Sequence, residues 1–405
     1  MKILFVAPYP PSPRIGGIGI RLYNTLRALA AKGEVTLVAL SEKKHQDLLE
    51  DCQSLCREVV VAEPAEANRP LGPATRSRWA SYWEALRSWL PASQRFRDRS
   101  GLVRVVRQAA ERCPPDLIWI TKSWIAGSLP NLDWSRTVVD FDDLEYRIMW
   151  RMMSLSHWYG SKIVLEPLEV WKQRRFEQRL SRLPARVTLC SERDRRRLGH
   201  GHVRVLPNCV AIPAAGTHGP EIPHRLLLIG KMNYEPNVDS AFFFCREILP
   251  LIRQVEPRAH VLIVGREPVE EIAALHTGTD IVVTGTVEDV EPYFAQAEIV
   301  VVPLRAGGGT RVKILEALAR GKAVVSTTIG AEGLGLRTGI ELYLADRPSE
   351  FARCCVTLMS DPDARTALGT AGRRLVEKEY SVHAFDEQVS RIIDEVLGVG
   401  AAVPK

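Results

Sequence analysis

The sequence of 405 residues lacks the features that mark membrane-spanning, secreted and metal-binding chains. No stretch approaches the uninterrupted apolar length that spans a bilayer, and no signal-peptide pattern precedes the first apolar segment, residues 3–7. The eight cysteines form no Cys-x-x-Cys pair and no metal-like grouping with histidine. Such cysteines are typical of small buried residues in a reducing compartment, so we expect a cytoplasmic protein.

The sequence also has little excess charge and no internal repeat or low-complexity tract. Its 54 basic and 48 acidic residues give a net charge of +6, which permits an anionic substrate or membrane surface and does not require nucleic acid. A chain of 405 residues is too long for one ordinary core. Apolar residues make up 46% and charged residues 25%, as in globular proteins, so we expect two domains.

The most informative stretch is residues 303–328. An apolar, β-branched run at 297–303 is typical of a buried parallel strand, and a second strand is expected at 323–326. Between them we expect a helix over 311–320, capped by Thr310 and ended by Gly321. The loop before this helix has no side chains, because it consists of Gly307, Gly308 and Gly309. The pattern predicts a parallel β-α-β unit.

The start of this helix has the composition of an anion site. Backbone N–H groups and the helix dipole favour negative charge there, yet Arg311 and Lys313 place cations in the first turn. A bound phosphate would offset the cost of that placement. Glu316 could accept two hydrogen bonds from the vicinal hydroxyls of a ribose. A solvated helix face with a Lys313–Glu316 pair is the alternative, but the coincidence of these groups favours a diphosphate and ribose site.

Residues 308–327 resemble the donor-site signature of the retaining glycosyltransferases of family 4, the glycogen-synthase-like glycosyl transferases group 1. The resemblance extends over nearly the whole chain. It implies the α/β class and the GT-B fold, with two facing Rossmann-like domains, parallel sheets and an interdomain cleft. Most of that family has two glutamates with seven residues between them. The second matches Glu316, whereas Gly308 occupies the position of the first, which contacts the donor sugar in the family.

The resemblance also implies the domain boundaries. Residues 1–210 would form the acceptor-binding domain and residues 211–380 the donor-binding domain. The helix expected at 381–398 would pack back on the first domain. A stretch rich in glycine and proline at 214–223 is typical of the linker between them.

In the first domain we expect a strand at 2–7, a helix at 18–32 and a strand at 35–40. Gly16 and Gly17 open the helix directly after the strand and a run of prolines. This loop resembles the first loop of the transferases, which faces the acceptor and the donor phosphates. We therefore assign Gly16 and Gly17 to donor binding.

Three carboxylates follow the strand expected at 137–139, where open α/β sheets bind ligands. Asp140, Asp142 and Asp143 could orient acceptor hydroxyls, or one of them could take the acceptor proton. We assign Asp140 and Asp143 to acceptor binding and Asp142 to catalysis. Capping of the next helix by Asp142 or Asp143 is an equal alternative, and a bound divalent metal is a poorer one. The histidine that many members of the family keep in this domain has no match within residues 118–124.

In the second domain Lys231 follows the strand expected at 226–229, at the position where the family's basic residue meets the donor diphosphate. With Arg311 and Lys313 it would stabilise the leaving group. A surface lysine in a loop is the alternative. Two further loops enclose the nucleobase in similar enzymes, and they contribute Arg266, Val287 and Glu288 here.

Two arginine-rich segments interrupt this plan. Residues 69–107 interleave nine arginines with five aromatic residues, and residues 150–197 contain ten more arginines within expected helices. Basic-aromatic segments lie well at a membrane interface. For residues 69–107, ordinary helices with aromatics packed inward and arginines in water are equally consistent with the pattern, and for residues 150–197 a solvated charged face is the default interpretation.

The sequence therefore predicts a retaining hexosyltransferase. It would move a sugar from a nucleotide-diphospho-sugar to a hydroxyl of a glycan or lipid-linked acceptor in polysaccharide or cell-surface glycan biosynthesis. We expect no metal, no other cofactor and no nucleic-acid partner. We also consider peripheral contact with anionic lipid at the inner face of the membrane. The alternatives are a nucleotide-sugar 2-epimerase of the same architecture and a non-catalytic subunit that binds nucleotide sugar or lipid.

Overall fold

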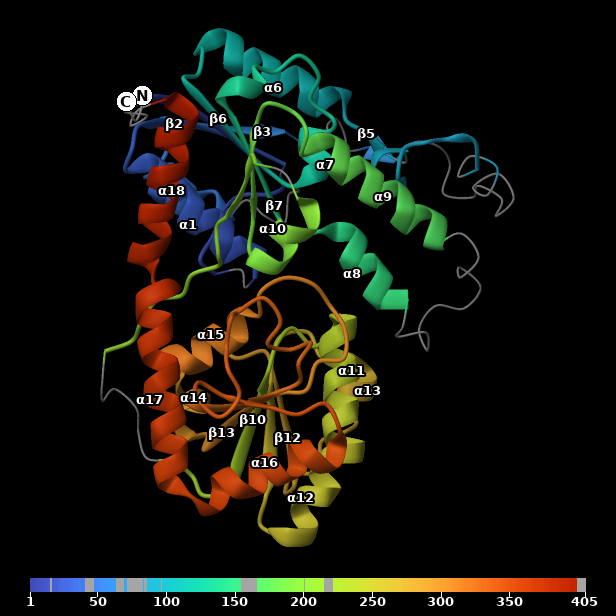
Figure 1. The fold of residues 1–405 in the computed structure, drawn as a ribbon, viewed down its shortest axis with the longest axis vertical. Coiled ribbons are helices and arrows are strands. Elements are labelled where there is room, and N and C mark those ends of the chain that lie inside the picture. The colour runs from blue at the N-terminus through green and yellow to red at the C-terminus, as the bar shows by residue number, and fades with distance from the viewer. Residues whose placement is uncertain are drawn as a thin grey trace. The chain divides into compact units, whose positions relative to one another are not determined.

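The computed structural model describes residues 1–14, 17–40, 47–62, 69–70, 83, 86–95, 97–153, 166–199, 201–214 and 221–398. The chain forms two compact units (Figure 1). Unit 1 contains Met1–Asn208 and Phe385–Lys405, and unit 2 contains Cys209–Ala384. In the part of the chain described, no helix is long and apolar enough to cross a membrane.

Unit 1 is built on a parallel sheet of seven strands in the order β3-β2-β1-β6-β7-β8-β9. Its strands are β1 (Lys2–Ala7), β2 (Glu34–Leu40), β3 (Glu58–Ala62), β6 (Leu117–Thr121), β7 (Thr137–Asp142), β8 (Arg186–Leu189) and β9 (Val203–Val205). All residues of β6 and β7 are buried, as expected where helices cover both faces of a parallel sheet. A separate antiparallel pair joins β4 (Arg69–Pro70) to β5 (Arg97–Asp98).

The longer helices of unit 1 are α1 (Ile18–Ala30), α6 (Ser100–Arg112), α8 (Glu145–Met152), α9 (Glu166–Leu180) and α18 (Val382–Leu397). Shorter ones are α2 (Glu50–Gln53), α5 (Ala92–Arg95), α7 (Ser123–Ala126), α10 (Glu192–Leu198) and the 3₁₀ turn Trp134–Arg136. Helix α18 buries an apolar stripe that includes Phe385, Val389 and Ile393. Two ion pairs fix this helix to the rest of unit 1, Arg27–Asp386 at 2.6 Å and Arg204–Glu395 at 2.8 Å.

Unit 2 is built on a parallel sheet of six strands in the order β12-β11-β10-β13-β14-β15. Its strands are β10 (Arg225–Ile229), β11 (His260–Val264), β12 (Ile281–Gly285), β13 (Ile299–Val302), β14 (Ala323–Ser326) and β15 (Tyr343–Leu344). Its helices are α11 (Glu235–Phe243), α12 (Leu249–Val255), α13 (Glu270–Ala273), α14 (Glu291–Gln296), α15 (Val312–Ala319), α16 (Pro348–Ser360) and α17 (Pro362–Glu379).

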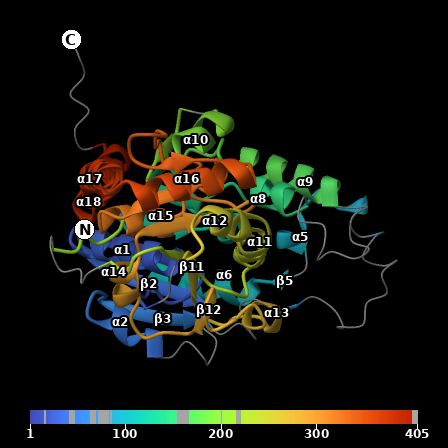
Figure 2. The same cartoon turned by 90° about the horizontal axis from the view of Figure 1, so that it is seen from below.

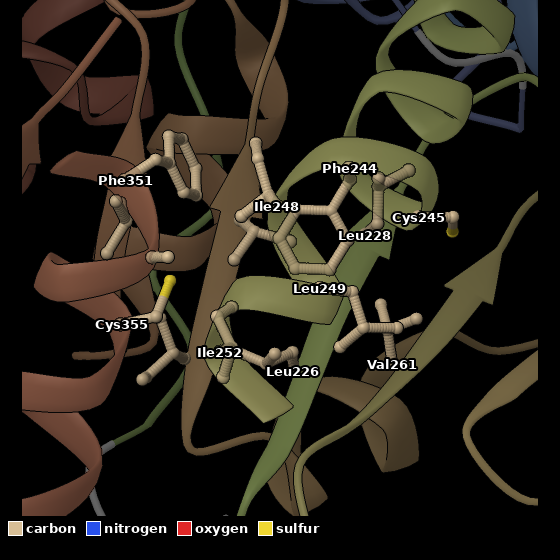
Figure 3. Packing of buried hydrophobic residues seen from close by; sticks show 14 of the residues in the cluster. Leu226, Leu228, Phe244, Cys245, Ile248, Leu249, Ile252, Val261, Phe351 and Cys355 are labelled. Carbon is tan, nitrogen blue, oxygen red and sulfur yellow. The ribbon is translucent and has the colours of Figure 1, made fainter. Parts of the chain in front are cut away.

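One face of the unit 2 sheet packs against α12 and α16 (Figure 3). Phe244 and Phe351 meet edge to face at the centre of this core, with ring centroids 6.2 Å apart. Phe244 lies in the π-helical turn Phe244–Ile248, which joins α11 to α12. The two ends of unit 2 meet, because the Val210 amide donates to the Tyr380 carbonyl at 2.9 Å and Val210 forms a parallel bridge with Ser381.

The prediction of two Rossmann-like domains with parallel sheets is confirmed. Most element boundaries agree to within two residues, but two expectations were wrong in detail. The strand expected at 137–139 extends to Asp142, so Asp140 and Asp142 lie inside β7. Thr310 does not cap the central helix, whose N-cap residue is Arg311.

We predict that Phe351→Ala destabilises unit 2 by about 3–5 kcal/mol, because Phe351 is 0% exposed and its removal leaves a cavity beside Phe244. In calorimetry of the full chain, the transition of unit 2 should fall by about 10 °C. Val255→Ala is the control, since Val255 is 68% exposed and should shift stability by about 0.5 kcal/mol or less. Equal effects of the two substitutions would contradict the packing described above.

Candidate active site

The glycine loop of unit 2 adopts a backbone that other residues disfavour. Gly307 and Gly309 have φ of 111° and 75°, in the left-handed region. A Cβ atom on Gly307 would also lie 3.3 Å from Nη2 of Arg311. Glycine is therefore required here both by the turn and by the guanidinium packed against it.

Arg311 stands at the N-cap of α15, where no side chain caps the helix. It is only 8% exposed, and its Nη1 donates to the Gly309 carbonyl at 2.7 Å. The guanidinium thus folds back on the glycine loop and lies beside the free N–H groups of the first helical turn. The structure brings Gly308, Gly309, Thr310 and Arg311 together at this helix start, because they are consecutive in the loop.

Lys313 lies one residue inside the helix and has a neutral partner. Its Nζ donates to Oδ1 of Asn237 at 2.8 Å, and a Cβ on Gly230 would lie 2.8 Å from the same Nζ. Gly230 therefore leaves room for the ammonium at the carboxyl end of β10. Burial, together with the charge of Arg311, lowers the pKa of Lys313 to about 7, and Glu316 offsets only part of this.

Glu316 is partly buried on the same helix. Burial raises the pKa of its carboxyl, which Arg320 and Lys313 partly lower and Glu291 raises further. Arg320 pairs with Glu291 at 2.8 Å and donates to the backbone carbonyl of Glu316 at 2.9 Å. Glu316 therefore lies near two cations, Arg320 and Lys313. None of the ion pairs recorded in the described part of the chain includes its carboxylate.

The other predicted donor residues of unit 2 lie on neighbouring loops. Lys231 follows β10, and its backbone carbonyl accepts a 2.9 Å bond from Nδ2 of Asn237. Its side chain is 57% exposed and its Nζ lies 3.3 Å from Glu267. Arg266 and Glu288 are exposed, whereas Val287 is half-buried and packs on the core. The structure therefore links Lys231 to Lys313 through Asn237, and leaves Val287 and Glu288 on the loop after β12.

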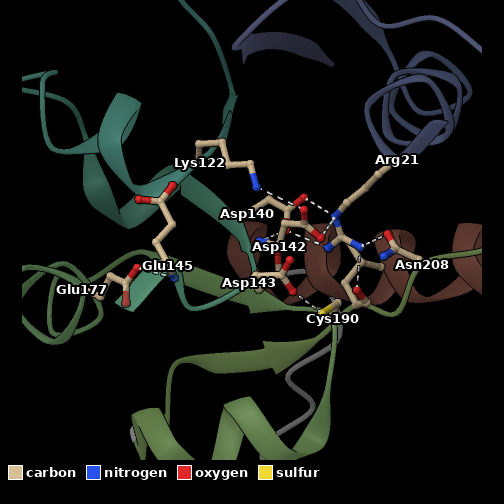
Figure 4. Close-up of polar contacts among 11 residues, drawn as sticks. Arg21, Lys122, Asp140, Asp142, Asp143, Glu145, Glu177, Cys190 and Asn208 are labelled. Atoms are coloured by element: carbon tan, nitrogen blue, oxygen red, sulfur yellow. Dashed lines mark hydrogen bonds and ion pairs between the residues drawn. The ribbon is translucent and has the colours of Figure 1, made fainter. Parts of the chain in front are cut away.

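In unit 1 Asp140 is fully buried and its carboxylate is occupied (Figure 4). Arg21 donates to both of its oxygens, from Nε at 2.9 Å and from Nη2 at 2.7 Å. Oγ1 of Thr188 donates to the same carboxylate at 2.7 Å. Arg21 also donates to the Leu206 carbonyl at 3.0 Å and to Oδ1 of Asn208 at 2.9 Å. Asp140 thus organises the end of the sheet, and we expect it to position Arg21.

Asp142 and Lys122 form an ion pair at the ends of the adjacent strands β7 and β6. The Lys122 Nζ lies 3.1 Å from Asp142 Oδ2, and Arg21 Nε lies 3.5 Å from Asp142 Oδ1. Both residues have positive φ, 64° for Asp142 and 84° for Lys122, although neither is glycine. Such strain is typical of functional sites. Burial raises the pKa of Asp142, but Lys122 and Arg21 outweigh it and hold the pKa below its usual range.

Sequence reasoning missed Lys122, because it sought a histidine within 118–124. The position directly after a buried strand was the available signal. Tyr9, which follows β1, was missed as well. Burial raises the pKa of its hydroxyl, and the charges of Lys122 and Asp142 act on it in opposite directions, so Tyr9 lies near this pair. Gly17 has φ of 65° before α1, and Gly16 lies outside the described residues.

Asp143 is hydrogen-bonded by the Cys190 thiol, with Sγ 2.9 Å from Oδ1. Neither Asp142 nor Asp143 caps α8, whose N-cap residue is Leu144, so that alternative was wrong. Ligand atoms of Asp142, Asp143 and Cys190 lie within 4.8 Å of one another. They do not fit a divalent cation, because Lys122 and Arg21 already neutralise Asp142 and because burial raises the pKa of the Cys190 thiol well above its usual value.

Behind this site lies a fully buried carboxyl, that of Glu177. Glu177 is 0% exposed, and its Oε1 accepts from the Glu145 amide at 2.8 Å and from Nε2 of Gln173 at 3.1 Å. Burial and then Glu145 raise the pKa of Glu177 well above its usual value. Gln173 Nε2 also donates to Glu145 at 3.0 Å, so one amide links the two carboxyls.

We predict that Lys122→Met destabilises unit 1 by about 3 kcal/mol, because it leaves the Asp142 carboxylate buried without its nearest cation. Arg195→Met is the control, since the Arg195–Glu192 pair is exposed and should contribute little to stability. In the native protein the lowered pKa of Asp142 contributes stability above the ordinary carboxyl pKa, and this is lost as pH falls through the lowered value. Denaturation at pH 7 and pH 2.5 should therefore show a smaller difference between variant and native protein at the lower pH. A constant difference would contradict the assignment.

Comparison with known proteins gives matches to part of the sequence. Residues 223–361 match the family described as Glycosyl transferases group 1. A GDP-mannose-dependent monoacylated alpha-(1-6)-phosphatidylinositol monomannoside mannosyltransferase of Corynebacterium glutamicum is 30% identical over 158 residues, which cover 36% of this chain and 41% of that protein. An uncharacterized 44.6 kDa protein in the cps region of Klebsiella pneumoniae is 23% identical over 137 residues, 32% of this chain and 35% of that protein. The matches thus span well under half of these relatives.

Solved structures match over almost the whole chain. Sucrose-phosphate synthase of Thermosynechococcus elongatus has a TM-score of 0.68 at 15% identity, covering 99% of this chain and 100% of that one. HepE of Anabaena in complex with UDP has a TM-score of 0.65 at 15% identity, covering 98% and 100%. Likeness at this identity shows the fold. The chain therefore has the GT-B fold, and its residues 223–361 carry the glycosyl transferases group 1 match.

Proposed function

We propose that the protein is a retaining glycosyltransferase. It moves a sugar from a nucleotide-diphospho-sugar to a hydroxyl of a glycan or lipid-linked acceptor, in polysaccharide or cell-surface glycan biosynthesis. The family match at residues 223–361 and the GT-B fold support transfer of a sugar. Two relatives indicate the class of donor and acceptor, since one is named for GDP-mannose and a phosphatidylinositol mannoside and the other was solved with UDP.

The observation that carries the proposal is the pair of cations at the start of α15. Arg311 and Lys313 are close enough for the charge of Arg311 to lower the pKa of Lys313, and the nearest partner of Lys313 is a neutral amide. Two like charges at a helix N-terminus are unfavourable alone and become favourable with a diphosphate bound. The glycine loop adds backbone N–H donors without side chains in the way.

In the proposed mechanism the departing nucleoside diphosphate is the group that the protein stabilises. Arg311, Lys313 and Lys231 neutralise the charge that develops as the bond to the sugar breaks. Glu316 accepts hydrogen bonds from the ribose hydroxyls, and Arg266, Val287 and Glu288 border the base. The leaving phosphate takes the acceptor proton on the same face of the sugar, so that configuration is retained without a covalent intermediate.

The acceptor half of the proposal rests on unit 1. Asp142 and Asp143 stand at the carboxyl end of β7, and Lys122 keeps Asp142 ionised. A carboxylate in that state orients an acceptor hydroxyl by accepting its hydrogen bond. We assign Lys122 the role of positioning Asp142. Gly17 in the first loop would face the donor phosphates.

The experiment that tests the function combines donor binding with turnover. A panel of UDP- and GDP-sugars is screened for thermal stabilisation, and the donor that binds is then assayed by NMR with and without glycan and lipid-linked acceptors. We predict that Arg311→Ala and Lys313→Ala each lower transfer at least ~100-fold, the scale of one lost charge-stabilising donor. Arg353→Ala, exposed on α16, is the matched control and should keep full activity.

Unchanged turnover in both variants would remove these cations from the mechanism. Conversion of the donor alone to a second sugar, with no acceptor required, would identify the 2-epimerase instead. Donor binding without conversion across the acceptor panel would identify a binding subunit.

We further predict that donor binding takes up a proton above pH 7. At pH 8 most of Lys313 is neutral, because its pKa in the free protein is about 7. A bound diphosphate favours the ammonium form and raises this pKa, so the Kd of the nucleoside diphosphate should increase as pH rises from 7 to 9. Calorimetry in Tris and HEPES, whose ionisation enthalpies differ, measures the uptake. Lys313→Met should abolish it, and uptake that persists in this variant would assign the proton to another group.

A further inference from the structure

Unit 1 exposes an unusual number of large apolar side chains on adjoining segments. Among the described residues, the exposed set includes Trp83 (59%), Leu86 (60%), Trp89 (70%), Leu90 (47%) and Trp171 (41%). Trp150 of α8 is a sixth, at 61%. Isolated apolar residues on a surface need no explanation, but tryptophans gathered on neighbouring elements do.

Trp89 and Trp171 form one surface because the start of α5 is fixed along α9. The Ala92 amide donates to Oε2 of Glu169 at 2.8 Å, and Oγ of Ser93 donates to Oε1 of Gln173 at 3.0 Å. The rings of Trp89 and Trp171 consequently lie 6.2 Å apart. Helix α8 lies beside α9 on the same side of unit 1 in two perpendicular views (Figures 1 and 2).

Helix α9 buries polar side chains as well as apolar ones. Lys172, Gln173 and Glu177 are at most 3% exposed, whereas Trp171 is turned outward. The buried groups are held by the Glu145–Gln173–Glu177 network and by the Lys172–Glu169 pair at 3.2 Å. The outward position of Trp171 therefore follows from a polar network. It is not the inward packing of aromatics that the sequence left as one alternative.

The exposed charges of α9 have one sign. The exposed residues of α9 are Pro167, Trp171, Arg174, Arg175 and Arg179, and none is acidic. Arginine also lies over the tryptophans, with Arg175 5.0 Å from the Trp171 ring and Arg87 5.7 Å from the Trp83 ring. Indole rings with a guanidinium over their face suit the headgroup level of a membrane.

We propose that this face is a docking surface for a bilayer that contains anionic lipid. We call it the tryptophan surface and define it by Trp83, Leu86, Arg87, Trp89, Leu90, Trp171, Arg174, Arg175 and Arg179. The indole and leucine side chains enter the headgroup region while the arginines pair with lipid phosphates. The inference deepens the proposed function, since a lipid-linked acceptor is presented at such a surface, but docking itself requires neither donor nor acceptor.

The test uses the full chain and two kinds of vesicle, phosphatidylcholine alone and phosphatidylcholine with phosphatidylglycerol. The native protein should co-sediment with the anionic vesicles, and its tryptophan emission should shift to shorter wavelength. Trp89→Ser/Trp171→Ser should weaken binding at least about tenfold. Arg174→Gln/Arg175→Gln should weaken vesicle binding by about fivefold per arginine, and added salt should also weaken it.

Matched controls are Val255→Ser and Arg353→Gln, which remove an exposed apolar and an exposed basic side chain from unit 2. Unaltered melting temperatures show that the variants fold. Failure of the native protein to bind anionic vesicles, or equal losses in the controls, would overturn the proposal. Self-association that the tryptophan variant abolishes, without vesicle binding, would likewise overturn it and assign the surface to a protein partner.

The outcome is separable from that of the proposed function. Lys313→Ala should abolish transfer and leave vesicle binding unchanged. The tryptophan variant should still transfer sugar to a short soluble acceptor while losing vesicle binding. Vesicle binding without any transfer would support the tryptophan surface and count against the transferase.

Discussion

Burial of both faces of each parallel sheet is the constraint on which the rest of the structure depends. Charged groups then have to gather where strands end, and the two units resolve this differently. In unit 1 the charges of Arg21, Lys122, Asp140 and Asp142 at the strand ends meet opposite ones. In unit 2 Lys313 meets the amide of Asn237 and the like charge of Arg311, and Glu316 offsets only part of that repulsion. The charges in unit 1 are thus neutralised within the protein, whereas the cations in unit 2 are suited to binding an anion.

This difference separates stability from ligand binding within one chain. A buried ion pair mainly fixes geometry, because its Coulomb energy is largely offset by desolvation. The strained backbones of Lys122 and Asp142 are held in place by that pairing. A buried cation beside another cation raises the electrostatic free energy of the free protein until an anion binds. The affinity for a diphosphate therefore depends on the protonation of Lys313. The glycines of the loop serve the same end, since they bring the backbone close without adding bulk.

Local features of the site could be read from the sequence, and long-range ones could not. The glycine loop, Arg311, Lys313 and Glu316 are within ten residues of one another, so the order of strand, loop and helix was sufficient to place them together. The Lys122–Asp142 pair depends on the pairing of β6 with β7 and on two positive φ angles, which no local pattern indicates. The outward face of α9 could not be predicted either, because the buried Glu177 and Gln173 determine which side of the helix faces the core. Periodicity alone treats such residues as solvated.

The junction at the two ends of unit 2 has a consequence for how this protein can be taken apart. Val210 and Tyr380 are hydrogen-bonded neighbours although 170 positions separate them, so the intervening chain leaves and returns at one point. A module whose entry and exit coincide can be excised or grafted into another host with little distortion of either. Unit 2 is therefore suited to transfer as one piece, which includes the glycine loop, Arg311, Lys313 and Glu316.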